Sequence, residues 1–446
     1  MKKILLLLLL PCFVHAQKKP NIVLILADDL GWGDVGYHGS SNRTPNIDQL
    51  AKEGAVLNRF YTSPICSPTR AGMMTGRYPN RFGLRANVIP PWSPFGVDTT
   101  EEFIPQMLAK AGYTNRAAIG KWHLGHSARK YLPLSRGFTH FYGHYNGAID
   151  YFTHEREGEL DWHNDEATSY DKGYSTDLIT NEAVQCIKNY AGKSPFFVYV
   201  AYNAPHSPFQ AKKEDLQLYG KDTSGRDSQT FAAMVTAMDR GIGQILQSIK
   251  DANIEDNTLV IFFSDNGSAD TLIGSNGGLR GMKFQEWDGG VRAPAIVKWP
   301  GVVQGGQTIE QVMGYIDIAP TLRQIAGINS KPPKPYDGIS MLPFWKGEKK
   351  SISRTMYLGF GSLIVDGWKI VKANMGNPKM EEKEDMLFNI MQDPSERKNV
   401  RAENEAMYAR LNKMVAEFDN IKSAMVVPAY HEGRKGFKAP KDWKVE

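Results

Sequence analysis

Cysteine is scarce in this chain, which has three among its 446 residues. Cys12 lies in an apolar N-terminal segment, which leaves Cys66 and Cys186 in the rest of the chain. Two cysteines cannot build the disulfide framework that stabilises small exported domains. Cys186 lies among apolar residues at helical spacing, which predicts a core position. Cys66 is therefore free for chemistry.

Long apolar runs are absent beyond the N-terminus, so we expect no membrane span. Lys2 and Lys3 precede a short apolar run, and Ala16 offers a small residue for cleavage. This pattern predicts a bacterial signal peptide over residues 1–16 and a periplasmic or secreted location. Pro11 is unfavourable for lipoprotein processing at Cys12, so export without a lipid anchor is the favoured interpretation.

Blocks of like charge are missing as well. The formal net charge is +5, and removal of the two lysines in the predicted signal peptide lowers it to +3. This modest excess suits an anionic ligand without identifying one, and the lack of a basic tract argues against a nucleic-acid partner. The composition, 41% hydrophobic and 23% charged, is that of an ordinary globular protein.

Apolar runs alternate with amphipathic stretches through the first three quarters of the chain. The runs expected to form strands cover 21–27, 195–200, 259–263 and 293–297, and the expected helices cover 45–53, 103–111, 176–190 and 229–250. Such alternation predicts an α/β fold, with a large mixed, mostly parallel sheet sandwiched by helices.

A proline-rich segment at 330–335 interrupts this pattern and marks a domain boundary. Three short strand-like runs follow, at 355–360, 362–365 and 368–373, and then a helical segment over about 402–418. The sequence therefore predicts a catalytic domain over residues 17–335 and a smaller C-terminal α+β subdomain over residues 336–446.

The most specific motif is Cys66-Ser67-Pro68-Thr69-Arg70, at the start of a stretch that can become helical. Proline is tolerated in a first helical turn, because its missing N–H would be unpaired there anyway. Cys66 would then lie at a helix N-terminus, where free N–H groups favour anions. Arg70 follows one turn later on the same face and can hold a charged oxygen.

Acidic side chains follow two of the expected strands. Asp28 and Asp29 come directly after 21–27, and Asp265 and Asn266 come just after 259–263. Together their oxygens can form a site for a hard divalent cation, and no Cys/His cluster with zinc spacing competes with it. Each cluster taken alone is better explained by capping and turn formation, whereas the two together with Cys66 favour a cation site.

Basic and imidazole groups occur in three further loops. Lys121 and His123 lie between glycines, His206 lies between two prolines, and Lys283 follows Leu-Arg-Gly-Met. Taken singly, a loop histidine or lysine is more often structural than catalytic.

These motifs, in this order, resemble the type I sulfatases, the formylglycine-dependent branch of the alkaline-phosphatase-like superfamily. The resemblance covers residues 21 to about 400. Within that family, the segments 27–39, 136–138 and 150–155 resemble arylsulfatase B, the N-acetylgalactosamine-4-sulfatases, whereas 158–174 does not obviously match. The resemblance implies an alkaline-phosphatase-like fold and hydrolysis of sulfate esters on a glycosaminoglycan-type sugar. That sugar would be O-sulfated N-acetylgalactosamine or galactose, with the 4-O position favoured.

The resemblance also implies that Cys66 is oxidised to formylglycine, whose hydrated aldehyde is the nucleophile, by a formylglycine-generating or radical maturation enzyme. It implies Ca²⁺, with Mg²⁺ as the alternative, held by Asp28, Asp29, Asp265, Asn266 and the modified Cys66.

The catalytic positions that it implies are Cys66, Arg70, Lys121, His123, His206, Asp265 and Lys283. Arg70, Lys121 and Lys283 would hold the nucleophile and sulfate oxygens. Asp265 would activate the nucleophile, and His206 with Lys283 would protonate the leaving sugar oxygen. His123 would take the proton that releases sulfate.

Sugar recognition is expected from the aromatic segment 142–155 and from Arg85, although a packed surface loop explains them equally well. Two alternatives stay open: a phosphoester hydrolase of the same superfamily, and a sulfated-glycan-binding protein without catalysis. Endo or exo action and the oligomeric state are not readable from the sequence.

Overall fold

The computed structural model describes residues 19–85, 87–220, 227–373, 375, 377, 379–380 and 382–445. The expected signal peptide, residues 1–16, lies outside these ranges, and so does Cys12. Within the described ranges, no helix combines the length and the apolar character needed to cross a bilayer.

A ten-stranded mixed sheet forms the centre of the molecule, in the order β13-β2-β12-β11-β1-β10-β4-β5-β8-β9. The five central strands β11, β1, β10, β4 and β5 are parallel, and antiparallel pairs occur on both sides of them. The strands of this sheet are β1 (Asn21–Ala27), β2 (Ala55–Leu57), β4 (Asn115–Lys121), β5 (His140–His144), β8 (His163–Asn164), β9 (Ala167–Thr168), β10 (Phe196–Ala201), β11 (Thr258–Ser264), β12 (Ala295–Lys298) and β13 (Gln307–Ile309).

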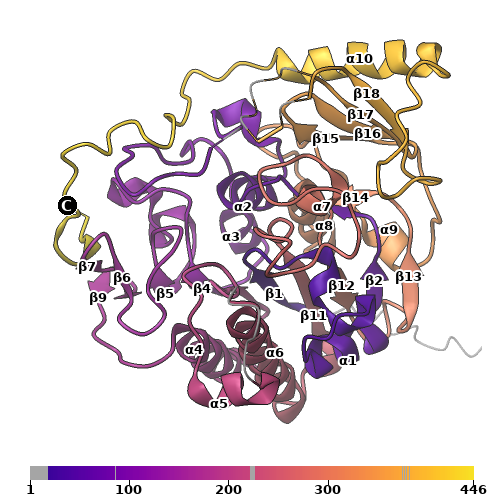
Figure 1. Ribbon diagram of the computed structural model, residues 1–446. Coiled ribbons are helices and arrows are strands. Elements are labelled where there is room, and N and C mark those ends of the chain that lie inside the picture. Colours follow the sequence, from indigo (N-terminus) through magenta and orange to yellow (C-terminus); the bar gives the residue numbers. More distant parts are fainter. Residues whose placement is uncertain are drawn as a thin grey trace, which may run out of the picture.

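Helices cover both faces of this sheet (Figure 1). The helices are α1 (Pro45–Glu53), α2 (Cys66–Thr75), α3 (Ile104–Ala109), α4 (Ser175–Tyr190), α5 (Lys213–Leu216), α6 (Ser228–Asp251), α7 (Asp288–Val291), α8 (Ile318–Ile325), α9 (Leu342–Trp345) and α10 (Glu405–Asp419). Alternate residues of β1 enter opposite cores, because successive strand side chains point to opposite faces. Val23 packs in the core with Met234 of α6, whereas Leu24 packs in the core with Met73 of α2. The expected α/β sandwich is thus confirmed.

The second sheet is antiparallel and has four strands, β15 (Thr355–Gly359), β16 (Ser362–Val365), β17 (Trp368–Val371) and β18 (Met386–Asn389). Helix α10 lies across it at the top of Figure 1. Buried side chains of this sheet, such as Met356 and Leu363, belong to the same hydrophobic cluster as Met73 of α2. The small unit therefore shares its core with the main sheet, and the division at residue 335 stays a prediction.

Two short strand pairs complete the fold, β3 (Phe60–Tyr61) with β14 (Met313–Gly314) and β6 (Glu155–Arg156) with β7 (Glu159–Leu160). The expected elements occur with small shifts at their ends. The helix expected over 103–111 ends at Ala109, because Gly112 (φ 85°) turns the chain and its N–H bonds to the Ala109 carbonyl. The helix expected over 402–418 begins at Glu405.

Candidate active site

The acidic residues meet because parallel strands present their carboxyl ends at one edge of the sheet. Ala27 of β1 is paired with Ser264 of β11, so Asp28 and Asp265 follow at the same level. The backbone N–H of Asp29 donates to Asp265 Oδ1 at 3.3 Å. Asp29 itself has a left-handed backbone conformation with φ of 68°. This conformation is unfavourable for bulky side chains. The two expected acidic clusters therefore form one group.

Helix α2 begins at Cys66, which is buried. Thr69 fixes the approach to the helix, since its hydroxyl accepts from the Ser63 N–H at 2.9 Å. Ile65 precedes the helix and cannot cap it with its apolar side chain. The first N–H groups of α2 therefore favour negative charge near residue 66. The helix end is as the sequence predicts.

Arg70 connects the helix to the acidic group. Its Nε donates to Asp265 Oδ2 at 3.0 Å and its Nη2 lies 2.8 Å from the same oxygen. Its Nη1 donates to the Lys121 carbonyl at 3.2 Å. Both Arg70 and Asp265 are fully buried, so each charge depends on the other for compensation.

Two lysines neutralise the other carboxylates. Lys121 Nζ donates to Asp28 Oδ2 at 2.5 Å, and Lys283 Nζ lies 2.7 Å from Asp29 Oδ1. The amide Nδ2 of Asn266 also donates to Asp29 Oδ1, at 2.7 Å. Burial raises the pKa of Asp29, but the charges of Lys283 and His206 and the hydrogen bonds from Lys283 and Asn266 together outweigh burial, so the net pKa is lowered.

The oxygen atoms of this group fit a divalent cation. Asp28 Oδ1 and Asn266 Oδ1 are buried and have no hydrogen-bond partner, which is costly for polar atoms unless an ion or water satisfies them. Ligand atoms of Asp28, Cys66 and Asp265 lie within 4.8 Å of one another. Carboxylate and amide oxygens are the ligands that Ca²⁺ and Mg²⁺ prefer. These residues are therefore chemically suited to the predicted ion.

His123 lies on the other side of Cys66. Its Nδ1 is 3.4 Å from the Cys66 sulfur, and its Nε2 is 3.0 Å from the Ile89 carbonyl oxygen. Burial lowers the pKa of His123, and the charge of Lys121 lowers it further. A β-carbon on Gly147 would lie 2.4 Å from the imidazole ring, so only glycine leaves room for the ring at that position.

His206 approaches the acidic group from the loop after β10. Its Nδ1–H donates to the Ser207 carbonyl at 2.6 Å, and its Nε2 lies 3.6 Å from Asp29 Oδ2. Burial, together with the charge of Lys283, lowers the pKa of His206 to about 3. His206 is therefore a neutral imidazole near pH 7.

Two further groups have altered acidity. Burial raises the pKa of the Cys66 thiol, so the unmodified sulfur is a thiol at neutral pH and a poor nucleophile. Burial, followed by the charge of Asp28, raises the pKa of Asp265 to about 6. All seven residues expected to be catalytic and all five expected ligands, ten residues in all because Cys66 and Asp265 belong to both sets, thus meet around residue 66.

A cavity of about 830 Å³ opens above Cys66. Its walls come from loops that are far apart in the sequence. The larger or charged lining residues include Asn87, His123, Arg156, His206, Lys283, Phe284, Phe360, Asn377, Lys379 and Tyr430. Of the expected sugar-binding segment, Gly147 and Ala148 line this cavity.

The tyrosines of that segment pack inside the protein instead, and its exposed Phe152 is not among the residues that line the cavity. Tyr142 lies edge-on to Trp162, and Tyr145 stacks on His163. Arg85 forms an ion pair with Asp419 and is not among the lining residues. Arg156, one position beyond the expected segment, lines the cavity in their place.

The sulfatase family model matches residues 20–328, and the model of the C-terminal part of N-sulphoglucosamine sulphohydrolase matches residues 283–423. Arylsulfatase J of Mus musculus is 37% identical over 69% of this chain and 52% of its own length. N-acetylgalactosamine-6-sulfatase of Homo sapiens is 35% identical over 74% of this chain and 66% of its own length. The chain thus spans between about half and two thirds of these curated relatives.

Among solved structures, that of Ps i-CgsB in complex with k-i-k-neocarrahexaose is similar, with a TM-score of 0.83 and 32% identity. The match covers 94% of this chain and 96% of that one. A match of this extent reaches beyond the main sheet and its helices.

Proposed function

This chain belongs to the sulfatase family, and from that membership we propose that it hydrolyses sulfate esters of a sulfated glycan. The observation that carries the proposal is the position of Cys66. It lies at the start of α2, between His123 and the Asp28–Asp265 group, at the base of the cavity. Three buried cations, Arg70, Lys121 and Lys283, surround the same point and suit a tetrahedral anion.

The nucleophile is proposed to arise from Cys66 by oxidation to formylglycine. The raised thiol pKa argues against catalysis by the unmodified sulfur. Because Cys66 is 2% exposed in the folded chain, a formylglycine-generating or radical maturation enzyme would reach it before folding is complete. That enzyme is the proposed protein partner.

The proposed cation is Ca²⁺, with Mg²⁺ as the alternative, held by Asp28, Asp29, Asp265, Asn266 and the modified residue 66. Formylglycine would supply a hydrated aldehyde as the nucleophile, and the cation would draw negative charge from the sulfate ester. An ion pair with Asp265 holds Arg70 in place, and an ion pair with Asp28 holds Lys121. Both side chains therefore place a positive charge near residue 66.

Proton movement is assigned to His123, Asp265 and Lys283. Since Nε2 of His123 lies against the Ile89 carbonyl, Nε2 carries the proton, and Nδ1 offers a lone pair to the group on residue 66. Asp265, on the opposite side, accepts the proton of the attacking hydroxyl. Burial lowers the pKa of Lys283, but the negative charges around it, Asp29 foremost, together raise the pKa on balance. Lys283 therefore carries a proton for the leaving sugar oxygen. His206 lies beside the same Asp29 carboxylate and, because its own proton is held on Nδ1 by the Ser207 carbonyl, it assists Lys283 only after its Nε2 has taken up a proton.

The proposed substrate is an O-sulfated N-acetylgalactosamine or galactose residue of a glycosaminoglycan-type chain. Relatives named N-acetylgalactosamine-6-sulfatase support the sugar, and the neocarrahexaose complex supports an extended oligosaccharide in the cavity. The 4-O sulfate remains the first candidate from the sequence motifs, and the 6-O sulfate is its direct competitor because of those relatives. The chain is proposed to act in the periplasm or outside the cell.

The decisive experiment expresses the chain with a maturation enzyme and analyses the Cys66 peptide by mass spectrometry alongside activity. We expect an aldehyde at residue 66 and sulfate release from a 4-O- or 6-O-sulfated galactosamine disaccharide. Phosphate esters, glucosamine sulfates and sulfated galactose compounds complete the substrate panel.

Each contrary result removes one part of the proposal. Faster turnover of phosphate than of sulfate esters would favour the phosphoester hydrolase. Glycan binding without sulfate release would favour a binding protein, and an active enzyme with an unmodified Cys66 thiol would exclude the formylglycine nucleophile.

A further inference from the structure

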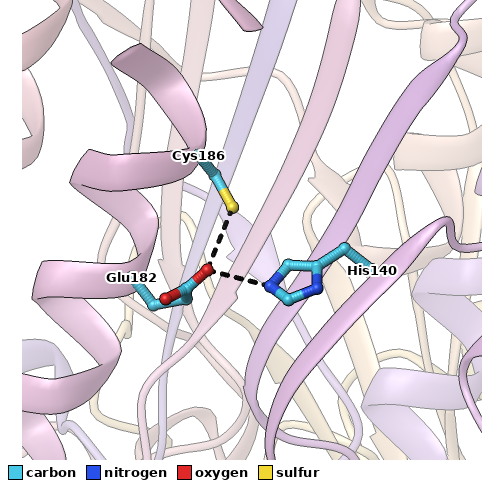
Figure 2. A group of neighbouring side chains, drawn as sticks. All are labelled: His140, Glu182 and Cys186. Carbon is cyan, nitrogen blue, oxygen red and sulfur yellow. Dashed lines mark hydrogen bonds and ion pairs between the residues drawn. The ribbon is translucent and has the colours of Figure 1, made fainter. Parts of the chain in front are cut away.

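A second cluster of metal-binding side chains lies between α4 and β5. It consists of His140, the first residue of β5, and of Glu182 and Cys186 of α4 (Figure 2). The two α4 residues are four positions apart, so they lie on the same face of the helix one turn from each other. Figure 2 shows both side chains pointing toward the imidazole of His140.

This cluster is separate from the active site. Strand β5 runs parallel to β4, with His140 beside Ala117 and His144 beside Lys121. Four residues of strand, about 13 Å, therefore separate His140 from the level of Lys121. His140 lies toward the amino end of the sheet, whereas the catalytic group lies at the carboxyl end.

The three donor atoms lie within 4.8 Å of one another, and two of their separations are close to those around a bound ion. His140 Nε2 lies 2.9 Å from Glu182 Oε1, and Cys186 Sγ lies 3.5 Å from the same oxygen. Zinc bonds of about 2.0–2.3 Å place tetrahedral ligand atoms about 3.3–3.6 Å apart. The sulfur–oxygen separation already matches, and the nitrogen–oxygen separation needs to widen by about 0.4 Å, which a small side-chain rotation provides.

Asp165 orients the histidine independently of this cluster. Its Oδ1 lies 3.0 Å from His140 Nδ1 and also accepts the Phe141 N–H at 2.9 Å. A metal-binding histidine usually donates its second ring N–H to a carboxylate, which fixes the tautomer and directs the other nitrogen to the metal. Asp165 thus leaves Nε2 of His140 facing Glu182 and Cys186.

We propose that His140 Nε2, Glu182 Oε1 and Cys186 Sγ bind one Zn²⁺ ion, with a water molecule as the fourth ligand. Thiolate and imidazole ligands favour zinc over Ca²⁺ or Mg²⁺. The His140 and Glu182 side chains are 19% and 26% exposed, which gives the ion and the water a path from solvent. The bound ion joins α4 to the sheet.

Protons compete with a metal ion for the ligand atoms of His140 and Cys186. Burial lowers the pKa of His140, but hydrogen bonds with Cys186 and Glu182 outweigh it and raise the pKa to about 10. Zinc binding replaces the extra proton of His140 and the thiol proton of Cys186, and both protons pass to solvent.

The test uses Co²⁺ as a spectroscopic probe on the full-length chain without an affinity tag, with excess Ca²⁺ to saturate the oxygen site. The background variant Cys66→Ser removes the other thiol of the described chain. We expect a sulfur-to-cobalt charge-transfer band and the strong visible bands of tetrahedral cobalt, and stoichiometric displacement of both by Zn²⁺.

Three further variants locate the ion. Cys186→Ser abolishes the charge-transfer band, and His140→Gln lowers the Co²⁺ affinity by about a hundredfold. Asp165→Asn lowers it by about tenfold, as expected for a residue that positions a ligand. His140→Gln retains the Cys186 thiol and changes a partly exposed side chain. Its Co²⁺ affinity therefore still tests the site if Cys186→Ser fails to fold.

Absence of the charge-transfer band in the Cys66→Ser background would overturn the proposal. So would a band that persists in Cys186→Ser, or an unchanged Co²⁺ affinity in His140→Gln.

Discussion

The imidazole of His123 presents its Nδ1 to the sulfur of Cys66 at 3.4 Å. The opposite ring nitrogen, Nε2, is held by the Ile89 carbonyl at 3.0 Å, and that oxygen can only accept a hydrogen bond. The proton of the neutral ring is therefore on Nε2, and the lone pair on Nδ1 faces residue 66. This tautomer is the one that a base acting on residue 66 requires.

Replacement of His123 tests this role. His123→Gln removes the base and should lower turnover of a chromogenic aryl sulfate by about 10²–10⁴-fold. Since His123 is assigned to sulfate release and not to the initial attack, the first turnover should be affected less. Rapid-mixing kinetics should then show a burst of released phenol followed by slow steady-state turnover.

His126 provides a matched control. It is a buried histidine from the same loop, and its Nε2 contacts the Pro91 carbonyl at 2.9 Å. His126→Gln should leave turnover within a few fold of the parent and show no burst. Equal losses in the two variants would mean that His123 acts through loop structure and not as a base.

The cation site yields a second prediction. Asn266→Ala removes an oxygen that is buried without a partner, so the activity should require more Ca²⁺. We expect the Ca²⁺ concentration for half-maximal activity to rise about tenfold or more, with full loss of activity after chelation and recovery on addition of Ca²⁺.

Asn21→Ala is the control for that change. Asn21 has a buried amide at the opposite end of β1, where its Nδ2 donates to Thr258 at 3.2 Å. Its variant should change thermal stability but not the Ca²⁺ requirement. A Ca²⁺ requirement that is unchanged in Asn266→Ala would remove Asn266 from the ligand set.

Strand and helix rules predict part of the catalytic group, and the family resemblance supplies its basic and imidazole residues Lys121, His123, His206 and Lys283. Asp28 and Asp265 follow buried strands that are parallel, and such strands end at one edge of a sheet. Cys66 and Arg70 are one helical turn apart, so the position of one determines that of the other. The spacing of Cys66 and Arg70 acts over a few residues, whereas the meeting of Asp28 with Asp265 depends on the pairing of β1 with β11.

The cavity walls could not be predicted in the same way. Phe284, Phe360 and Tyr430 come from separate loops, and only the packing of the C-terminal unit on the main sheet brings them together. The aromatic residues of 142–155 suit a sugar by composition, yet Tyr142 and Tyr145 contribute to internal packing. The cluster around His140 also has no motif, since Glu182 and Cys186 follow ordinary helical spacing and meet His140 through tertiary packing.

Arg156 is expected to contribute to binding of anionic glycans. It lines the cavity, and its backbone oxygen is fixed by the Trp443 indole N–H at 2.9 Å. A hydrogen bond between Arg156 and a charged sugar group is worth about 1.5–3 kcal/mol. Arg156→Gln should therefore raise KM for a sulfated or uronic-acid-containing oligosaccharide by about 10–100-fold. The kinetic constants for a small aryl sulfate should not change.

Arg85→Gln is the comparison for Arg156→Gln. Arg85 forms an ion pair with Asp419 in α10 and packs over Phe360. Its loss should lower thermal stability without altering the ratio of KM values for oligosaccharide and aryl sulfate. A larger effect of Arg85→Gln on oligosaccharide KM would return Arg85 to sugar recognition and contradict the assignment of Arg156.

The buried carboxyl group of Glu286 should make the free energy of unfolding depend on pH. One carboxylate oxygen accepts the Ser362 hydroxyl at 2.9 Å, and the other is buried without a hydrogen-bond partner. Burial raises the pKa of Glu286 from 4.5 to about 7. The folded state therefore favours the protonated form. The stability that this proton contributes is complete below about pH 4.5, the ordinary value, and is lost as the pH rises through 7.

Glu286→Gln mimics the protonated acid, because its amide oxygen still accepts from Ser362. The variant should have nearly the same free energy of unfolding as the parent near pH 4.5, and should exceed it by on the order of 3 kcal/mol at pH 8. Urea unfolding at several pH values measures this difference, with the exposed Glu417→Gln as a control expected to follow the parent. Parallel stability curves for the parent and Glu286→Gln would show that Glu286 is ionised in the folded protein throughout this range.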